Sequence, residues 1–397
     1  MPYTPESGPE NVVTLKVVGV GGAGNNVVNR MVKSGTQGIE YVAINTDKQA
    51  LAVSSADQKI QIGEKLTHGQ GAGSDPEMGK RSAEESRNNI AKSLENADMV
   101  FITAGMGGGT GTGAAPTIAD IAREAGLLTV AVVTKPFKFE GKRRMDQALV
   151  GINELLGKVD SLLIIPNDRL KYATDQKVTL ANAFEIADDV LRQAVTSISD
   201  LIKNTGFINL DFADVTCIMK DAGFAHMGVG HAAGKGKAED AARMAVASPL
   251  METSINGARG VLINITGSED MGLEDVETAA NLVQEAAHPD ANIIFGASFD
   301  PSLDDEIRVT VIATGFEDPS KVEEPAPAAQ PAARPVNTGF YSAASDMRAA
   351  APAAPAAPAA PAAPAPAAPA APAAPAQPAA PAEEDPFDSI FKIFNSK

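Results

Sequence analysis

The sequence predicts an α/β protein: a doubly wound, mostly parallel sheet, then a long connecting helix, a second α+β domain and a disordered C-terminal tail. Three observations support this. From residue 12 to about 173, runs rich in Val and Ile alternate with helix-like segments, which is typical of parallel strands covered on both faces. Residues 179–204 contain no Gly or Pro and place apolar residues at three- and four-residue steps. After residue 316 the chain becomes mostly Ala and Pro.

The composition excludes several classes of protein. A formal net charge of −17 argues against nucleic acid as a partner and against binding to anionic lipid. The sequence has no run of about eighteen apolar residues, so we expect no direct membrane insertion, and its start does not resemble a signal peptide. The single cysteine, Cys217, excludes a disulfide within the chain, fits a cytoplasmic protein and is expected to pack in the core.

The elements of the first half follow from the apolar runs. Asp75 and Pro76 predict the N-cap and first turn of one helix running through 77–97. A helix is also expected over 23–35, and another over 117–126. The strands are expected within the segments 14–22, 38–47, 98–105, 127–134 and 161–168.

In the second half the order of the expected elements changes, from regular alternation to a mixed α+β pattern. Helices are expected over 237–248 and 273–287, and strands over 214–220, 224–232, 260–268, 292–298 and 306–316. The predicted organisation is a flexible N-terminal extension (1–11), a first domain (12–178), a connecting helix (179–206), a second domain (207–316), a linker (317–382) and a C-terminal peptide (383–397).

The tail combines a spacer with a short apolar peptide. Proline at nearly every third position of the linker forbids helix and favours a solvated polyproline-II tether. In the peptide, Asp385 and Pro386 predict a helix start. A helix of about twelve residues is marginal alone, so we expect it to order against a partner protein, or against the body of this chain. Its apolar face comprises Phe387, Ile390, Phe391 and Phe394.

The first glycine cluster, GVGGAGNN at 19–26, lies between a predicted strand and a predicted helix. Gly19, Gly21 and Gly24 satisfy the G-x-G-x-x-G spacing, and Asp47 follows where a dinucleotide enzyme binds its ribose. An NAD-dependent oxidoreductase with a Rossmann-type site is therefore one candidate function.

The second cluster, GGGTGTG at 107–113, follows the predicted strand at 99–104. Five glycines at a strand end let a ligand approach the backbone closely, and the amides of such a loop cradle anions. Two converging loops suit a triphosphate better than a dinucleotide. There is no G-x-x-x-x-G-K-[ST] match, so the chain is not a P-loop enzyme.

Further motifs extend this interpretation over residues 12–316. GGGTGTG matches the tubulin signature loop. Together with GVGGAGNN, INTDKQAL, GAGSDPEMG, PFKFEGKRR, IPNDRL, NLDFAD and VIATGF, it resembles the FtsZ family of tubulin-like division GTPases. The resemblance implies GTP/GDP with Mg²⁺, head-to-tail filaments that form the cytokinetic ring, and a cytoplasmic location at the division site under the membrane. It also implies that the C-terminal peptide binds division adaptor or membrane-tethering proteins.

The resemblance assigns nucleotide contacts residue by residue. The first phosphate loop comprises Gly21, Gly22, Ala23, Gly24, Asn25 and Asn26. Ala72 and Gly73 reach the γ-phosphate. The α- and β-phosphates are wrapped by Gly107, Gly108, Gly109, Thr110, Gly111, Thr112 and Gly113. Ribose, phosphate and base are contacted by Glu140, Arg144, Asn167, Phe184 and Asp188, of which Asp188 accepts two parallel bonds from guanine. Whether Arg143 or Arg144 faces the nucleotide stays open.

Acidic residues in NLDFAD are the candidate catalytic groups. Viewed alone, Asp211 and Asp214 are capping or turn residues. The first half, however, offers no group to orient the attacking water that phosphoryl transfer requires. The resemblance implies that these two residues, with Asn209, complete the site of the next subunit. A non-catalytic scaffold with a degenerate pocket is the third candidate class.

No metal site is expected within the protein itself. The four histidines, His68, His226, His231 and His288, are dispersed and have no partners at ligand spacing. Magnesium is expected to enter with the triphosphate.

Overall fold

The computed structural model describes residues 13–36, 38–172, 178–179, 182–203, 208, 211–250, 255–268, 270–300 and 303–316. These residues belong to the first of two compact units, 1–326 and 327–397. The N-terminal extension, the linker and the peptide with its predicted apolar face lie outside the described residues, as does Asn209.

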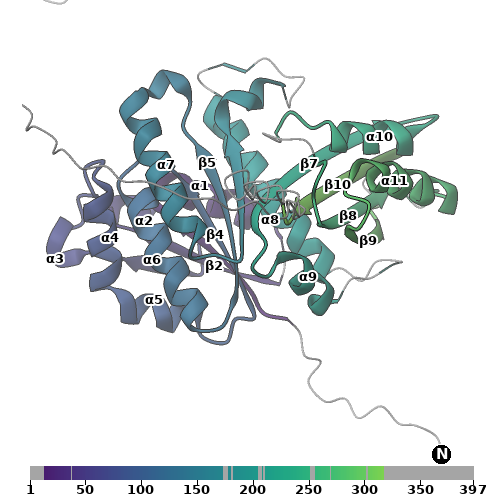
Figure 1. Ribbon diagram of the computed structural model, residues 1–397. Coiled ribbons are helices and arrows are strands. Elements are labelled where there is room, and N and C mark those ends of the chain that lie inside the picture. The colour runs from purple at the N-terminus through teal and green to yellow at the C-terminus, as the bar shows by residue number, and fades with distance from the viewer. Residues whose placement is uncertain are drawn as a thin grey trace, which may run out of the picture. The chain divides into compact units, whose positions relative to one another are not determined.

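A sheet of ten strands runs through the described part of the chain (Figure 1). Its order is β3-β2-β1-β4-β5-β6-β7-β10-β8-β9. All neighbouring strands pair in parallel except β10, which is antiparallel to both β7 and β8. The strands are β1 (Leu15–Val20), β2 (Ile39–Asn45), β3 (Gln58–Gln61), β4 (Met99–Gly105), β5 (Leu128–Lys135), β6 (Ser161–Pro166), β7 (Gly223–Ala233), β8 (Gly260–Gly267), β9 (Asn292–Phe299) and β10 (Glu306–Thr314). The predicted mostly parallel sheet is confirmed.

Helices cover both faces of the parallel part. On one face, α1 (Gly21–Lys33) and α8 (Ala183–Lys203) pack on alternate residues of β1 such as Val17. The other alternate residues, such as Val18, share a second core with the helices of the opposite face (Figure 1). These are α4 (Pro76–Glu85), α5 (Arg87–Leu94), α6 (Thr110–Glu124) and α7 (Lys142–Leu156). This two-sided burial explains why the strands read as continuous apolar runs.

The remaining helices lie around the ends of the sheet. A third core forms where α10 (Lys237–Val246) and α11 (Leu273–Ala286) pack on β8, β9 and β10. The shorter elements are α2 (Lys48–Ala52), α3 (Glu64–Thr67), α9 (Phe212–Met219) and the 3₁₀ turns η1 (Lys138–Glu140) and η2 (Asn167–Tyr172). The sheet continues from β6 to β7 through three pairs of residues, so one sheet runs through both predicted domains. The boundaries of those domains stay predictions.

The helix predicted over 77–97 is two helices. Asp75 does cap α4, since its carboxylate accepts from the Glu77 amide at 3.0 Å. The helix ends at Glu85, and α5 begins after Ser86, whose backbone (φ −101°, ψ 13°) leaves the helical region. The Ser86 hydroxyl accepts a bond from the Gly63 amide at 3.3 Å. The Ser86 amide bonds to the Ala83 carbonyl at 3.1 Å, an i to i−3 bond of the kind that closes the last turn of a helix.

The strand predicted over 214–220 is wrong, because the segment forms α9. Its apolar run is too short for periodicity to separate helix from strand. The deciding signal is a capping box: Asp211 accepts from the Asp214 amide at 2.8 Å, and Asp214 accepts from the Asp211 amide at 3.2 Å. The helix buries Val215, and Cys217 is exposed instead of packing in the core.

Three further helix starts differ from the sequence prediction. The connecting helix α8 begins at Ala183, four residues later than expected, after a turn in which Asn182 accepts from the Thr179 amide at 2.7 Å. Conversely, α6 begins at Thr110 and not at residue 117, and α1 begins at Gly21. Both glycine clusters are thus partly helical, and their amides form helix N-termini.

Candidate functional site

A cavity of about 230 Å³ lies at the carboxyl ends of the parallel strands. Strand β1 ends there with Val20 and β4 with Gly105, which is the usual position of ligand sites in doubly wound sheets. The cavity brings together most of the predicted nucleotide contacts: Gly21, Gly22, Ala23, Gly108, Gly109, Thr110, Gly111, Glu140, Arg144, Asn167, Phe184 and Asp188.

The first glycine loop is shaped by close backbone approaches. A Cβ atom on Gly24 would lie 2.2 Å from the carbonyl oxygen of Thr103, so only glycine lets α1 start this near to β4. Gly21 has a φ of +72°, and Gly22 has no atom within 4 Å of its Cβ position and faces open space. Glycine at these positions therefore combines tight packing beneath the loop with an accessible backbone above it.

Asn25 and Asn26 do not line the cavity. Asn25 is 3% exposed. With the side-chain amide oriented by its neighbours, its nitrogen donates to the Gly19 carbonyl at 2.8 Å, and its oxygen accepts from the Asn45 side chain at 3.1 Å. It therefore supports the loop from below, whereas Asn26 is exposed.

The second glycine loop has the same division of roles. Gly107 has a φ of +100°, and its amide donates to the buried Thr112 hydroxyl at 2.7 Å. The Cβ position of Gly113 lies 1.8 Å from the Pro76 carbonyl oxygen, so glycine here sets the contact between α4 and α6. These three residues shape the loop, and four residues between them line the cavity: Gly108, Gly109, Thr110 and Gly111.

The segment predicted to reach the γ-phosphate lies against this loop. The Cβ position of Gly109 is 2.8 Å from the Cβ of buried Ala72. Gly73 follows with a φ of +59° and is exposed. Neither Ala72 nor Gly73 lines the cavity in this structure.

Three further residues of the cavity lining are Asn167, Phe184 and Asp188. Asn167 is 5% exposed, and its side-chain oxygen has no hydrogen-bond partner within the described part of the chain. Phe184 is half exposed and meets the ring of Phe137 edge-on at 5.5 Å. A buried unpaired acceptor beside an accessible aromatic ring is suited to a planar polar ligand.

Asp188 is the buried acid of the cavity. The pKa of its carboxyl is raised from 3.8 to about 6: burial is the largest cause, Arg30 opposes it, and Glu185 adds a smaller rise. The Arg30 Nε atom lies 3.6 Å from the carboxylate. Asp188 is therefore ionised at neutral pH and available as an acceptor.

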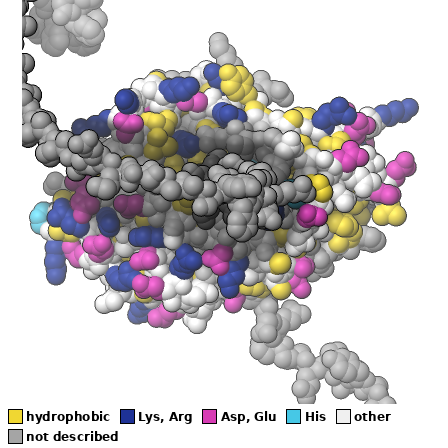
Figure 2. All heavy atoms as spheres, viewed as in Figure 1, with side chains coloured by type: hydrophobic (Ala, Val, Ile, Leu, Met, Phe, Trp, Pro, Cys, Tyr) yellow, Lys and Arg dark blue, Asp and Glu magenta, His cyan; other side chains and the backbone are white. Residues whose placement is uncertain are grey.

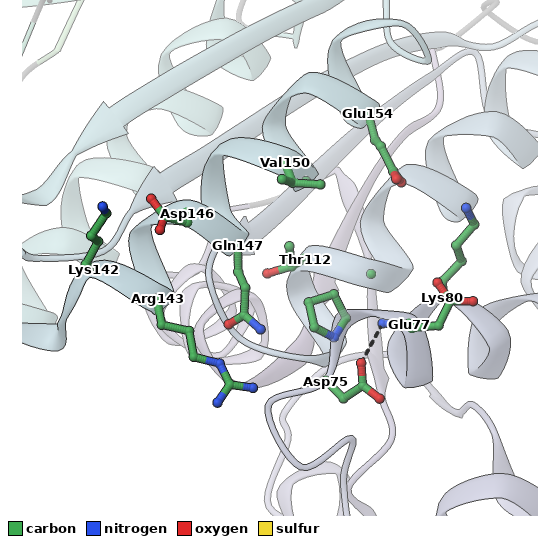
Figure 3. Close-up of a pocket in the computed structure, with 13 residues that line it drawn as sticks. Asp75, Glu77, Lys80, Thr112, Lys142, Arg143, Asp146, Gln147, Val150 and Glu154 are labelled. Atoms are coloured by element: carbon green, nitrogen blue, oxygen red, sulfur yellow. Dashed lines mark hydrogen bonds between the residues drawn. The ribbon is translucent and has the colours of Figure 1, made fainter. Parts of the chain in front are cut away.

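Arg144, and not Arg143, lines this cavity. Its Nε atom lies 3.1 Å from Glu140, which also accepts from the Phe137 amide at 2.8 Å. Arg143 belongs to a second, larger cavity of about 730 Å³ between α4, α6 and α7 (Figure 3). Figure 3 places Arg143 and Gln147 on α7, across from Asp75 at the start of α4.

The acidic turn does not contribute to the cavity. Asp211 and Asp214 pair with one another in the capping box and are absent from the cavity lining. Just before them, Ile208 exchanges two backbone hydrogen bonds of 3.2 Å with Ala297 at the edge of the sheet. The turn is thus anchored to β9 on one side and to α9 on the other.

The features expected of a dinucleotide enzyme are missing at Asp47. Its carboxylate caps α2 by accepting from the amides of Gln49 and Ala50, at 2.8 and 3.3 Å. It does not line the cavity, so the residue that made the first glycine cluster look like a Rossmann site is explained locally.

The described residues were also compared with what a charged binding patch, a metal site or a membrane span requires. Figure 2 shows basic and acidic side chains intermingled over the visible face. Among the described residues, no three His, Cys, Asp or Glu side chains lie together as a metal site requires, and no helix is long and apolar enough to span a bilayer.

A tubulin-like class of nucleotide-binding protein is defined by this sheet and its two glycine-rich helix N-termini. Two family models match the chain: Tubulin/FtsZ family, GTPase domain, over residues 14–175, and FtsZ family, C-terminal domain, over residues 223–317. Together they cover most of the described residues.

Comparison with solved structures gives the same family. An empty FtsZ dimer from M. jannaschii is 45% identical, with a TM-score of 0.74 over 76% of this chain and 88% of that one. A point mutant of M. jannaschii FtsZ matches at 45% identity and a TM-score of 0.74, over 77% and 91%. CetZ2 from Haloferax volcanii, in a GTPγS-bound protofilament, shares the fold at 21% identity and a TM-score of 0.64, over 76% and 92%.

The chain belongs to the FtsZ family. It is therefore a GTPase of the filament-forming, cell-division type, and neither the matches nor the site supports the oxidoreductase alternative.

Sequence reasoning missed some residues of the cavity. Met106, Thr134, Pro136 and Ala187 also line it, and Arg30 supports it from α1. Thr134 was detectable, because the carboxyl end of β5 must lie beside that of β4 in a parallel sheet. Arg30 was not, since its contact depends on how α1 packs on α8.

Proposed function

We propose that GTP binds in the 230 Å³ cavity, with its phosphates on the two glycine loops and its guanine at the end formed by Asn167, Phe184 and Asp188. Two helix N-termini, those of α1 and α6, meet at the loops and offer amide donors and positive dipole ends to the phosphates. Backbone binding of this kind explains why no lysine lines the cavity.

Base selection follows from the polar groups at the far end. An ionised Asp188 accepts from the N1 and N2 hydrogens of guanine, a pair that adenine lacks. The unpaired oxygen of Asn167 accepts from the base or the ribose, and Phe184 stacks on the base. Arg144, steadied by Glu140, contacts ribose or phosphate.

We further propose that hydrolysis requires two subunits. The observation that carries this proposal is the separation of the two halves of the site within one chain. Phe184 and Asp188 lie at the start of α8, and this helix of 21 residues spans about 30 Å before the chain reaches Ile208 and Asp211. Asp211 and Asp214 therefore act on the nucleotide of a neighbouring subunit, where they orient the attacking water. Asn209, the third predicted catalytic residue, remains part of this proposal.

Such a site assembles only in a head-to-tail contact. A pocket at one end of the subunit and an acidic turn at the other make a heterologous interface, which repeats into an open filament. Bound GTP then bridges subunits, and its hydrolysis weakens the joint.

Magnesium fits the cavity as a companion of the nucleotide. The carboxylates that line it, Glu140 and Asp188, are engaged by Arg144 and Arg30. Mg²⁺ is readily held by phosphate oxygens and water with few protein ligands, and its charge would neutralise the phosphates.

The tail extends this function to recruitment. In our proposal the linker tethers a peptide that binds adaptor or membrane-tethering proteins through Phe387, Ile390, Phe391 and Phe394, and so brings cytoplasmic filaments to the division site.

Substitution of the acidic turn tests the in-trans site. Asp211→Asn and Asp214→Asn are expected to lower GTP turnover by at least about 100-fold, the scale of a lost catalytic group, while the affinity for GTP stays unchanged. Asp290→Asn, an exposed acid in the turn after α11, is the control. Near-normal phosphate release by both acidic-turn variants would contradict the proposal.

A further inference from the structure

Arg30 lies behind the carboxylate that is proposed to read the base. It is on α1, whose N-terminus forms the first glycine loop, and it does not line the cavity. Its guanidinium lies 3.6 Å from Asp188 and 3.6 Å from Glu185, both on α8. One side chain thus connects the helix that begins at the phosphates with the helix that carries the base contacts.

Among the residues that the structure describes, Arg30 is the cationic side chain within ion-pair distance of Asp188. From its own helix Asp188 faces Glu185, a like charge. Across the cavity the nearest charged lining residues are Glu140 of η1 and Arg144 of α7, which pair with each other at 3.1 Å. The balance of charge at Asp188 therefore depends on Arg30.

The contact is poorly explained as a stabilising salt bridge. The Arg30 side chain is 37% exposed and that of Glu185 is 65% exposed, and such pairs contribute only about 0–1 kcal/mol to stability. The Asp188 side chain, by contrast, is 11% exposed, so a nearby cation has a large effect on its ionisation. Burial and Glu185 both favour the protonated carboxyl, which would present a donor to the donor edge of guanine.

We propose that Arg30 is a positioning residue for guanine specificity, which keeps Asp188 ionised and aimed at the N1 and N2 hydrogens of the base. The proposal rests on the proposed binding of GTP in this cavity. Arg30 acts through Asp188 and does not touch the nucleotide.

The test compares GDP with inosine diphosphate, which lacks the 2-amino group and so offers Asp188 one bond instead of two. Affinities of the full chain for both nucleotides are measured by calorimetry from pH 6 to pH 8, a range in which both bases keep their N1 hydrogen. The variants are Arg30→Gln, Arg30→Lys and, as a matched control, Lys33→Gln, which removes an exposed charge from the last turn of the same helix.

For Arg30→Gln we expect the preference for GDP at pH 7 to fall by about threefold or more, since without the cation Asp188 titrates at higher pH. At pH 8 a larger fraction of the carboxylate is ionised without help, so the preference recovers toward the wild-type value. Arg30→Lys retains part of the preference at pH 7, and Lys33→Gln behaves as wild type.

Two results would overturn the inference: an Arg30→Gln chain with wild-type preference at pH 7, or one whose preference is reduced equally at pH 7 and pH 8. The second would indicate a purely structural role. A wild-type chain that does not distinguish the two nucleotides at any pH would instead refute the assignment of Asp188, and with it this part of the proposed function.

Discussion

At the scale of single residues, the site contains polar groups that are buried in surroundings unfavourable to them. Asp188 is 7% exposed yet must carry a charge, and its pKa of about 6 reflects that conflict. Asn167 buries an oxygen with no partner among the described groups. Each of these features costs stability in the empty protein, and the guanine nucleotide that we propose to bind here would relieve it.

Replacement of the buried acid should therefore separate stability from function. The folded-state pKa of Asp188 lies above its ordinary value, so its ionisation costs stability as pH rises from about 4 through 6. Asp188→Asn removes this cost, and nucleotide-free protein should gain on the order of 1–3 kcal/mol at pH 8 but much less at pH 4, while GTP affinity falls. Urea denaturation at both pH values measures the difference, and an equal gain at the two would contradict the stated cause.

At the scale of secondary-structure elements, the glycine loops are products of helix packing as much as of ligand binding. Gly24 lets α1 approach β4, and Gly113 lets α6 approach α4. The sequence predicted a strand-to-helix turn at the first cluster and an anion-binding loop ahead of a helix at the second. The structure instead has helix N-termini whose first residues are glycines, so part of each cluster is required by packing beneath the site.

Gly113 offers a direct test of that packing role. An added Cβ would lie 1.8 Å from the Pro76 carbonyl oxygen, so Gly113→Ala forces α4 and α6 apart. We expect a loss of about 1–3 kcal/mol in unfolding free energy, typical of overpacking. Gly157→Ala is the control, because no atom lies within 4 Å of its Cβ position and its φ is −74°. Equal stability of the two variants would disprove the packing role.

The anchor of the acidic turn gives a second test at this scale. Ala297 on the edge strand β9 exchanges two backbone bonds with Ile208, and Pro at residue 297 removes the donated one. Ala297→Pro should lower GTP turnover about tenfold or more with GTP affinity retained, because the acidic turn loses its support. Ala297→Ser, which keeps the amide donor at the same residue, is the control. Similar turnover in both variants would mean that the anchor does not position the turn.

At the scale of the whole chain, the sequence predicts the sheet class and most of the residues that line the cavity, because buried parallel strands and glycine-rich strand ends are local signals. The prediction fails where packing or capping decides: a strand is expected at α9, one helix at α4 and α5, and a buried side chain at Cys217. The role of Arg30 depends on a contact between two helices distant in sequence. The linker and peptide stay predictions.

The central claim is that one chain carries both halves of the active site but cannot bring them together. Phosphate release per subunit, measured against protein concentration, tests it most directly. The account predicts almost no turnover below a threshold concentration and a steep rise above it, as filaments bring each acidic turn to a neighbouring pocket. Dilute monomers that hydrolyse GTP as fast per molecule as concentrated protein would contradict it.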